Sequence, residues 1–197
     1  MNKKQYALVI DLDRCIGCLG GCLVACKLQH GTALGDSRSK MYKMESGHYP
    51  DLEMYFLPVM CQQCENAPCA VLCPTGACYK DPEDGVVKID TGRCVGCGTC
   101  RKNCPYGAMN FNKEMHIMDK CDICSELRAR GEKLACEKNC AGGAINYGDI
   151  NDPESEVSKL IRDAGENVYS LTDEGNKPSG RFILRGAKWK EEEPWKI

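Results

Sequence analysis

Four groups of four cysteines limit what this chain can fold into more than any other feature. The chain has 197 residues and 17 cysteines, and each group ends in the same C-x-x-x-C step. The groups are Cys15, Cys18, Cys22 and Cys26; Cys61, Cys64, Cys69 and Cys73; Cys94, Cys97, Cys100 and Cys104; and Cys121, Cys124, Cys136 and Cys140. Thiolate is a soft ligand, and one cubane iron–sulfur cluster needs four of them. The groups therefore predict four [4Fe–4S] clusters, and so many clusters in a small chain predict electron transfer.

The composition alone gives a weak hydrophobic core. Aromatic residues are 7% of the chain, with three Phe and two Trp, and cysteine supplies a large part of the 43% counted as hydrophobic. A chain so poor in large apolar side chains is marginal on burial alone. Because the free energy of metal binding is also free energy of folding, bound clusters would stabilise it. We expect the apoprotein to be largely unfolded or molten.

The N-terminal sequence and the charge argue against several classes of protein. The apolar run at residues 6–10 ends at Asp11, which makes it too short for the core of a secretory signal. No segment approaches the ~20 apolar residues of a membrane span, so we expect no direct membrane span. From these residues we expect a cytoplasmic location, with export of the folded chain beside a signal-bearing partner as the alternative. The formal net charge of −2 gives no reason to expect nucleic-acid binding.

The cysteine groups belong to an internal repeat. A short apolar stretch, an Asp and a basic residue stand before the first cysteine of groups one, three and four, at residues 9–15, 88–94 and 117–121. Each unit therefore predicts a short strand, a cysteine-bearing loop with one helical turn, and a second short strand. The expected strands are residues 6–10, 86–89 and 115–118, and the segments after Gly76, Gly107 and Gly143, each of which precedes an Ala.

Spacing within the groups favours iron–sulfur binding over structural zinc. Group three, from Cys94 to Cys104 with Pro105 after it, has the C-x2-C-x2-C-x3-C-P pattern of bacterial ferredoxins without departure. The other groups are wider at one step, most of all between Cys124 and Cys136. Zinc ribbons use two C-x2-C pairs separated by a loop rather than such triplets. Zinc or a [3Fe–4S] centre therefore stays as the alternative mainly for group four.

Few residues outside the groups suggest chemistry. Cys78 aligns in the repeat with Met109 and Ile145, so we expect a small buried hydrophobic residue rather than a ligand. We expect no catalytic residues, because the histidines are scattered and no glycine-rich nucleotide fingerprint follows a strand. The histidines are His30, His48 and His116. A cation stands directly before the first cysteine of three groups, and these cations are Arg14, Arg93 and Lys120. Each of them either raises the reduction potential of a nearby cluster or is a solvated surface residue.

Three segments around the cysteines resemble a known family. Residues 68–77, 84–87 and 120–124 look like the four-cluster iron–sulfur electron-transfer (beta) subunits of the dimethyl sulfoxide reductase family of molybdenum or tungsten bis-pterin oxidoreductases, and the resemblance covers residues 6–149. It implies an α+β fold of two fused bacterial 2[4Fe–4S] ferredoxin-like halves with pseudo-two-fold symmetry, short strands and helices, and many loops. The implied halves are residues 1–27 with 112–150, which hold groups one and four, and residues 55–111, which hold groups two and three.

Two segments lie outside the implied halves. Residues 28–54 are a polar insertion, and residues 151–197 are a polar C-terminal arm with Trp189 and Trp195 near its end. The favoured interpretation of the arm is a surface segment packed on its own domain. The alternative is an arm that docks on a partner subunit.

The resemblance also implies which cysteines share a cluster. Three cysteines of one group and the last cysteine of its partner group would bind each cluster. The implied sets are Cys15, Cys18, Cys22 and Cys140 for cluster A; Cys121, Cys124, Cys136 and Cys26 for cluster B; Cys61, Cys64, Cys69 and Cys104 for cluster C; and Cys94, Cys97, Cys100 and Cys73 for cluster D. Spacing alone does not separate this arrangement from one that pairs group one with two and group three with four.

The function that the resemblance implies is a relay of electrons through four [4Fe–4S] clusters. The chain would be a non-catalytic subunit of an oxidoreductase complex of anaerobic respiration, bound to a large molybdenum or tungsten bis-pterin catalytic subunit of a reductase, dehydrogenase or dehydroxylase. A ferredoxin, a cytochrome or a membrane subunit would exchange electrons at the far end. The alternatives are a free-standing soluble polyferredoxin and the electron-transfer subunit of a hydrogenase. Soluble carriers are often strongly acidic, so the net charge of −2 favours the subunit over the carrier.

Overall fold

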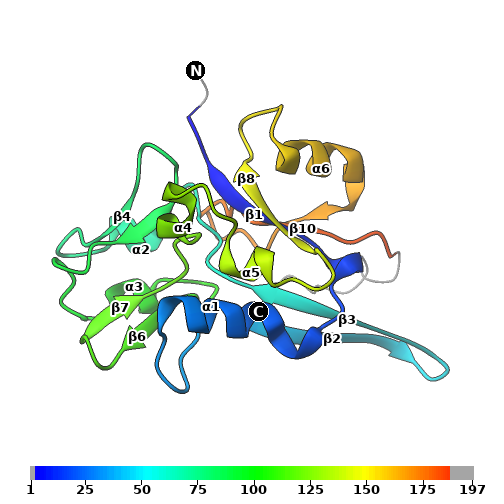
Figure 1. Cartoon of the computed structure of the whole chain (residues 1–197), viewed down its shortest axis with the longest axis horizontal. Coiled ribbons are helices and arrows are strands. Elements are labelled where there is room, and N and C mark those ends of the chain that lie inside the picture. The colour runs from blue at the N-terminus through cyan, green and yellow to red at the C-terminus, as the bar shows by residue number, and fades with distance from the viewer. Residues whose placement is uncertain (1–2, 187–197) are drawn as a thin grey trace.

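A computed structural model describes residues 3–186 of the chain (Figure 1). Within this range the strands form one four-stranded sheet, in the order β8–β1–β10–β9, and three two-stranded sheets. In the larger sheet β1 (Tyr6–Asp11) pairs antiparallel with β8 (Ile145–Asp149) and parallel with β10 (Arg181–Ile183), which pairs with β9 (Val168–Tyr169). The N-terminal strand therefore lies between two strands from the other end of the sequence.

Both faces of the four-stranded sheet are covered. The helix α6 (Glu156–Ala164) lies over one face, where its Val157 packs with Val9 of β1 (Figure 1). On the opposite face Leu8 and Ile10 belong to the main core, which also contains many of the cysteines. Because side chains alternate along a strand, β1 supplies both layers at once and its sequence is a continuous apolar run.

Antiparallel strand pairs connect each cysteine group to the next in a closed ring. The strand after one group pairs with the strand before the following group, and β8 with β1 closes the ring from group four back to group one. The other pairs are β2 (Lys40–His48) with β3 (Asp51–Val59), β4 (Cys78–Lys80) with β5 (Val87–Ile89), and β6 (Asn110–Asn112) with β7 (Ile117–Asp119). The repeat in the sequence thus appears in the structure as a repeated strand pairing.

Two strands differ from the sequence-based expectation. The strand predicted at residues 115–118 begins only at Ile117, because His116 has a φ of 55° and lies outside the extended region. The segment at residues 28–54, predicted as a polar insertion, contributes β2 and the first part of β3, which form a long hairpin that projects from the body (Figure 1). Since β3 continues to Val59, the expected boundary at residue 54 falls inside a strand.

Short helices carry the third cysteine of every group. The helices of the cysteine-bearing region are α1 (Gly21–His30), α2 (Pro68–Val71), α3 (Thr99–Lys102), α4 (Ser125–Ala129) and α5 (Ala135–Lys138), and the 3-10 turns are η1 (Leu12–Arg14), η2 (Cys18–Gly20) and η3 (Gly165–Asn167). The helix α1 is longer than the single predicted turn. It packs against α5, and α2 packs against α3. These two contacts bring group one beside group four and group two beside group three.

The segment after the last cysteine is built into the fold. Phe182 is buried in the main core, and Arg185 binds the carboxylate of Asp11 with Nη1 3.1 Å from Oδ2. Residues 187–197, which include Trp189 and Trp195, lie outside the described residues. Among residues 3–186, the helices are too short or too polar for any of them to cross a bilayer.

Candidate metal centres

The third cysteine of every group occupies the same position in a helix. Cys22, Cys69, Cys100 and Cys136 are buried and are the second residues of α1, α2, α3 and α5. The first backbone N–H groups of a helix have no partner within the helix. Burial raises the pKa of Cys22 and Cys100 to about 11, and the backbone amide of the following residue acts in the opposite direction. Each helix start therefore offers donors to a negatively charged sulfur.

The last cysteine of groups two, three and four is followed by a tight turn that returns a backbone amide to its sulfur. At the bend, Gly76, Gly107 and Gly143 have φ values of 63°, 56° and 58°, which residues with a Cβ rarely adopt. Cys78 N–H donates to Cys73 Sγ at 3.3 Å, Ala108 N–H to Cys104 Sγ at 3.5 Å, and Ala144 N–H to Cys140 Sγ at 3.1 Å. The glycine of the repeat thus allows a hydrogen bond to each of these sulfurs.

Two cavities have walls of cysteine and apolar side chains. The first is lined by Cys15, Cys18, Cys22 and Cys140, which we call set A, together with Ile16, Met41 and Pro58. The second is lined by Cys73, Cys94, Cys97 and Cys100, which we call set D, together with Ile89, Val95 and Met118. Set A joins sulfurs of groups one and four, and set D joins sulfurs of groups two and three.

The remaining cysteines lie in two further sets. Burial raises the pKa of Cys64 to about 12; the Asn176 amide opposes this shift, and the nearby thiolates of Cys61, Cys69 and Cys104 add to it. Burial is also the main cause of the raised pKa of Cys136 and of Cys121. The nearby thiolates of Cys124 and Cys26 raise the pKa of Cys136 further. Those of Cys26 and Cys136 raise the pKa of Cys121 further. Following the pairing that the resemblance implies, we call Cys61, Cys64, Cys69 and Cys104 set C, and Cys26, Cys121, Cys124 and Cys136 set B.

The chemistry of the four sets fits cubane iron–sulfur clusters. Because burial raises the pKa of most of these thiols, free thiolates are unfavourable there. A bound cationic metal centre reverses that preference, since a coordinating thiol is deprotonated. Within residues 3–186 no group of three or more His, Cys, Asp or Glu side chains is close enough to hold a single metal ion. The cysteines of sets A and D line cavities instead.

Neighbouring thiols connect the sets in one order. Burial is the largest cause of the raised pKa of Cys136, Cys121 and Cys100, and the negative charge of a thiolate in a neighbouring set raises each pKa further. Cys22 of set A has this effect on Cys136 of set B, and Cys61 of set C has it on Cys121 of set B. Cys69 of set C has the same effect on Cys100 of set D. The order is therefore A–B–C–D. Cys18 in set A and Cys97 in set D are exposed, whereas no cysteine of sets B and C among the described residues is.

Cys78, the cysteine outside the groups, is buried as its alignment with apolar residues predicts. It also lies between sets C and D. A hydrogen bond between its thiol and that of Cys69, followed by burial, holds the pKa of Cys69 far above its ordinary value. Its side chain lines the cavity of set D.

Lys120 differs from the other two cations that precede a first cysteine. Its side chain is only 3% exposed, and its Nζ donates to the backbone oxygens of Cys121, at 2.8 Å, and Val87. Burial lowers its pKa, but the thiolates of Cys61, Cys121 and Cys69 outweigh this and raise it. Arg14 and Arg93 are exposed. The three cations therefore differ in position. Lys120 is a buried charge between sets B and C, and the two arginines are surface cations.

Two side chains that contact sulfur were missed by the sequence analysis. His30 Nε2 lies 3.3 Å from Cys124 Sγ, and Asn176 Nδ2 donates to Cys64 Sγ at 3.0 Å. His30 stands at the end of α1, one turn beyond Cys26 of the same set B, so helical spacing is a signal that finds it. Asn176 lies far from every cysteine in the sequence, and no local pattern marks it.

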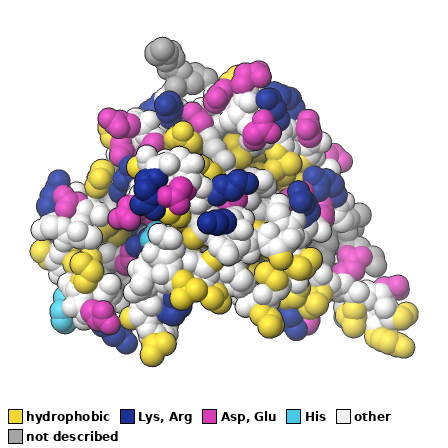
Figure 2. All heavy atoms as spheres, viewed as in Figure 1, with side chains coloured by type: hydrophobic (Ala, Val, Ile, Leu, Met, Phe, Trp, Pro, Cys, Tyr) yellow, Lys and Arg dark blue, Asp and Glu magenta, His cyan; other side chains and the backbone are white. Residues whose placement is uncertain are grey.

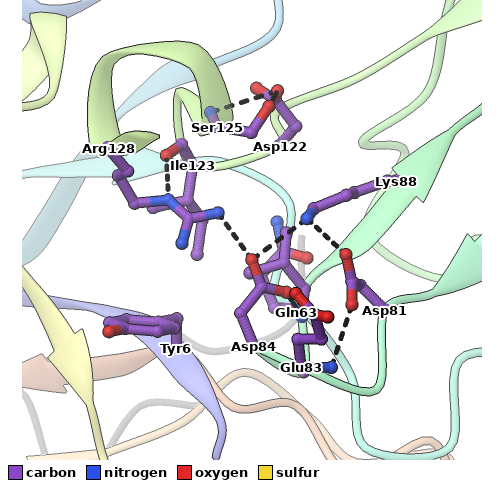
Figure 3. Close-up of polar contacts among 12 residues, drawn as sticks. Tyr6, Gln63, Asp81, Glu83, Asp84, Lys88, Asp122, Ile123, Ser125 and Arg128 are labelled. Atoms are coloured by element: carbon purple, nitrogen blue, oxygen red, sulfur yellow. Dashed lines mark hydrogen bonds and ion pairs between the residues drawn. The ribbon is translucent and has the colours of Figure 1, made fainter. Parts of the chain in front are cut away.

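An ionic network joins segments that are far apart in the sequence (Figure 3). Arg128 of α4 donates to the Asp84 carboxylate at 2.9 Å and to the Ile123 carbonyl at 2.8 Å, and its guanidinium lies over the ring of Tyr6 at 5.1 Å. The same carboxylate accepts from Lys88 at 3.1 Å. Since these residues come from β1, the β4–β5 hairpin and the segment that leads into and forms α4, the network holds three distant segments of the chain together.

Short strands, helical turns and buried cysteine sets define a ferredoxin-like iron–sulfur protein with [4Fe–4S] clusters. A family model described as a 4Fe-4S dicluster domain matches residues 52–150. The chain is 36% identical to a sulfite dehydrogenase subunit of Allochromatium vinosum, over 92% of this chain and 83% of the relative. It is 35% identical to a protein of Halobacterium salinarum named as a dimethyl sulfoxide reductase iron-sulfur subunit, over 98% and 83%. It is 38% identical to the thiosulfate reductase electron transfer subunit PhsB of Salmonella typhi, over 80% and 82%.

The chain belongs to this family of iron–sulfur electron-transfer subunits. Two of these relatives are named as an iron-sulfur subunit and an electron transfer subunit, as the resemblance in the sequence predicts. The chain is accordingly a non-catalytic subunit that transfers electrons.

Proposed function

We propose that the chain relays electrons through four [4Fe–4S] clusters to or from a molybdenum or tungsten bis-pterin catalytic subunit. The observation that carries this proposal is the order A–B–C–D, with an exposed sulfur at each end and buried or half-buried sulfurs between. Such an arrangement suits a relay, because electrons enter and leave at the surface while the inner centres stay shielded from solvent. A catalytic partner is supported by relatives named as subunits of a sulfite dehydrogenase and a dimethyl sulfoxide reductase.

The proposed ligands are the four sets of sulfurs. Cluster A would be bound by Cys15, Cys18, Cys22 and Cys140; cluster B by Cys121, Cys124, Cys136 and Cys26; cluster C by Cys61, Cys64, Cys69 and Cys104; and cluster D by Cys94, Cys97, Cys100 and Cys73. Each set takes three sulfurs from one group and the last from another, as in two-cluster bacterial ferredoxins. When bound, each cluster supplies a reversible one-electron couple.

We further propose two ferredoxin-like halves related by pseudo-two-fold symmetry. Residues 1–27 with 112–150 would hold clusters A and B, and residues 55–111 clusters C and D. The helix contacts support this division, because α1 packs on α5 in the first half and α2 on α3 in the second. In each pair, the second residue of each helix is the third cysteine of a cysteine group in that half. Residues 28–54 would be an insertion and residues 151–197 an addition to this core.

The polypeptide would set the spacing and the potentials of the clusters. Backbone amides donate to Cys73, Cys104 and Cys140, and an N–H donor stabilises the extra negative charge of a reduced cluster. The buried ammonium of Lys120 acts in the same direction on clusters B and C. Buried or half-buried apolar side chains line the inner walls of the two cavities: Met41 and Pro58 at set A, and Ile89 and Met118 at set D.

Exposed apolar side chains lie near sets A and D, the two ends of the order A–B–C–D. Ile16 and Leu19 flank Cys18 in set A, and Val95 and Val71 lie in the segments that carry set D. In Figure 2, hydrophobic side chains gather along the lower edge of the face that is shown, over the region of α1 and the β2–β3 hairpin. Contiguous apolar surface on a soluble protein is typical of interaction sites. We propose that each end docks a redox partner.

Anaerobic affinity purification of the tagged full chain from its native cells tests this function. We expect iron and acid-labile sulfide for four clusters, and a large co-purifying chain whose fractions contain molybdenum or tungsten and pterin. Recovery of the iron-loaded chain alone, as a monomer, would instead support the free carrier. Co-purification with a nickel-containing chain would support the hydrogenase subunit. Zinc in place of iron would contradict both the clusters and the relay.

A further inference from the structure

Asn176 is a buried side chain from outside the cysteine-bearing region. It lies in the segment between β9 and β10, and its side chain is only 4% exposed. This segment is held against group two by backbone hydrogen bonds, in which Glu65 N–H donates to Lys177 O at 2.9 Å and Asn66 N–H to Asn176 O at 3.1 Å. The C-terminal segment therefore reaches into the loop that carries Cys64.

The amide of Asn176 is fixed at both of its ends. Its Nδ2 donates to Cys64 Sγ at 3.0 Å and to the Tyr106 hydroxyl at 2.8 Å. Its Oδ1 accepts from Glu174 N–H at 3.1 Å, which requires the nitrogen of the amide to face the sulfur. The Tyr106 hydroxyl donates its own proton to the carbonyl of Thr172 at 2.8 Å. Every polar atom of the amide thus has a partner, and the donor cannot rotate away from the sulfur without losing several hydrogen bonds.

A donor held in this way affects the two redox states of a cluster differently. Reduction adds one negative charge to the cluster, and part of that charge resides on the cysteine sulfurs. A hydrogen bond to a charged acceptor is stronger than one to a neutral acceptor, and a buried site strengthens it further. A fixed N–H therefore stabilises the reduced state more than the oxidised state and raises the reduction potential.

We propose that Asn176 is a positioning residue that raises the reduction potential of the cluster bound by Cys64. The inference rests on the proposed ligand set of cluster C, and it assigns a role in electron transfer to a segment that holds no cysteine. One consequence is that the potential of cluster C depends on the position of the C-terminal segment. Anything that lifts residues 171–179 from group two would make cluster C harder to reduce.

Redox titration of the anaerobically purified full chain, followed by electron paramagnetic resonance, tests the proposal. The variants are Asn176→Leu, which removes the donor, and Asn176→Asp, which keeps the shape and presents a carboxylate to the sulfur. In both we expect full iron and sulfide content, a more negative midpoint potential for one of the four clusters, and unchanged potentials for the other three. The Asp variant should give the larger shift, because its charge repels the added electron.

The matched control is Asn66→Asp. Asn66 Nδ2 donates to Gly175 O at 3.2 Å, so it joins the same two segments without contacting a sulfur. We expect its four potentials to equal those of the unmodified chain. The proposal is overturned if both Asn176 variants keep four unshifted potentials, or if Asn66→Asp shifts a potential equally. It is also overturned if both Asn176 variants lose iron while Asn66→Asp retains it, because the amide would then only hold the segment. A chain without iron in its unmodified form would overturn the proposed function as well.

Discussion

The guanidinium of Arg128 and the carboxylate of Asp84 form a hydrogen-bonded ion pair at 2.9 Å, with both side chains largely buried. Arg128 follows the second cysteine of group four, and Asp84 lies between groups two and three. The pair therefore bridges the segments around sets B and C, and it explains why loops so rich in cysteine can hold a defined position relative to one another.

Replacing Arg128 with Met should lower the stability of the cluster-loaded protein. The change removes the donors to Asp84 and Ile123 and leaves a partly buried carboxylate with Lys88 as its remaining charged partner. We expect a cost of about 2 kcal/mol, equivalent to a Tm lower by roughly 4–8 °C for a chain of this size. Anaerobic thermal denaturation followed by cluster absorbance measures it.

Arg130→Met is the control for this prediction. Arg130 stands two residues along and pairs with Glu132, but both side chains are about half exposed. Exposed ion pairs contribute little to stability because solvent screens them, so the Tm should barely change. Equal shifts in the two variants would show that the network in Figure 3 contributes no more than a surface pair.

Replacing Lys120 with Met should make clusters B and C harder to reduce. The buried ammonium favours the added negative charge of a reduced cluster. For a separation of about 8 Å and an effective dielectric constant of about 20, the interaction is on the order of 2 kcal/mol, or roughly 90 mV for one electron. Redox titration should give two potentials that shift downward and two that stay in place.

The control is Arg93→Gln, at an exposed position, which should leave all four reduction potentials nearly unchanged. A shift in this variant as large as in Lys120→Met would contradict the role assigned to burial.

Cys97→Ser and Cys78→Ala should have opposite effects on metal content. Cys97 belongs to set D and is exposed, and its replacement should remove or open one cluster, with a loss of up to about a quarter of the iron. Cys78 is buried beside Cys69, and its replacement should leave the iron content unchanged at a cost of about 1 kcal/mol for the lost packing. Iron and sulfide assays on anaerobic samples decide between ligand and packing roles. Iron loss in the Cys78 variant would make Cys78 a ligand.

Removal of iron should unfold most of the chain. The core consists of aliphatic side chains mixed with cysteines, so loss of the clusters leaves cavities lined by thiols. Because cluster binding contributes free energy of folding, we expect the near-ultraviolet circular dichroism of the apoprotein to collapse while part of the far-ultraviolet signal remains. Retention of a native near-ultraviolet spectrum without iron would show that burial alone is sufficient.

Much of the local structure could be predicted from the cysteine repeat. The strand at Tyr6–Asp11, the strand at Val87–Ile89 and the turns at Gly76, Gly107 and Gly143 follow from patterns a few residues long. Such features depend on backbone conformation and on the alternation of apolar residues, both of which are local properties of a sequence.

The parts that were missed depend on contacts between distant residues. The pairing of β10 with β1 joins residues near opposite ends of the chain, and Asn176 reaches Cys64 from more than a hundred positions away. Lys120 and Arg93 occupy equivalent places in the repeat, yet one is buried and the other exposed. Burial of one copy of a repeat follows from what packs over it in the folded chain, and no local sequence pattern shows which segment that will be.

The ring of strand pairs has a consequence for biosynthesis. The sulfurs of sets C and D all lie between Cys61 and Cys104, whereas sets A and B need partners as far apart as Cys15 and Cys140. Short loops close at a smaller entropic cost than long ones. As the polypeptide leaves the ribosome, we therefore expect the middle of the chain to receive its iron and sulfide first. Sets A and B are complete only when Cys140 and Cys136, which precede β8 in the sequence, have been synthesised.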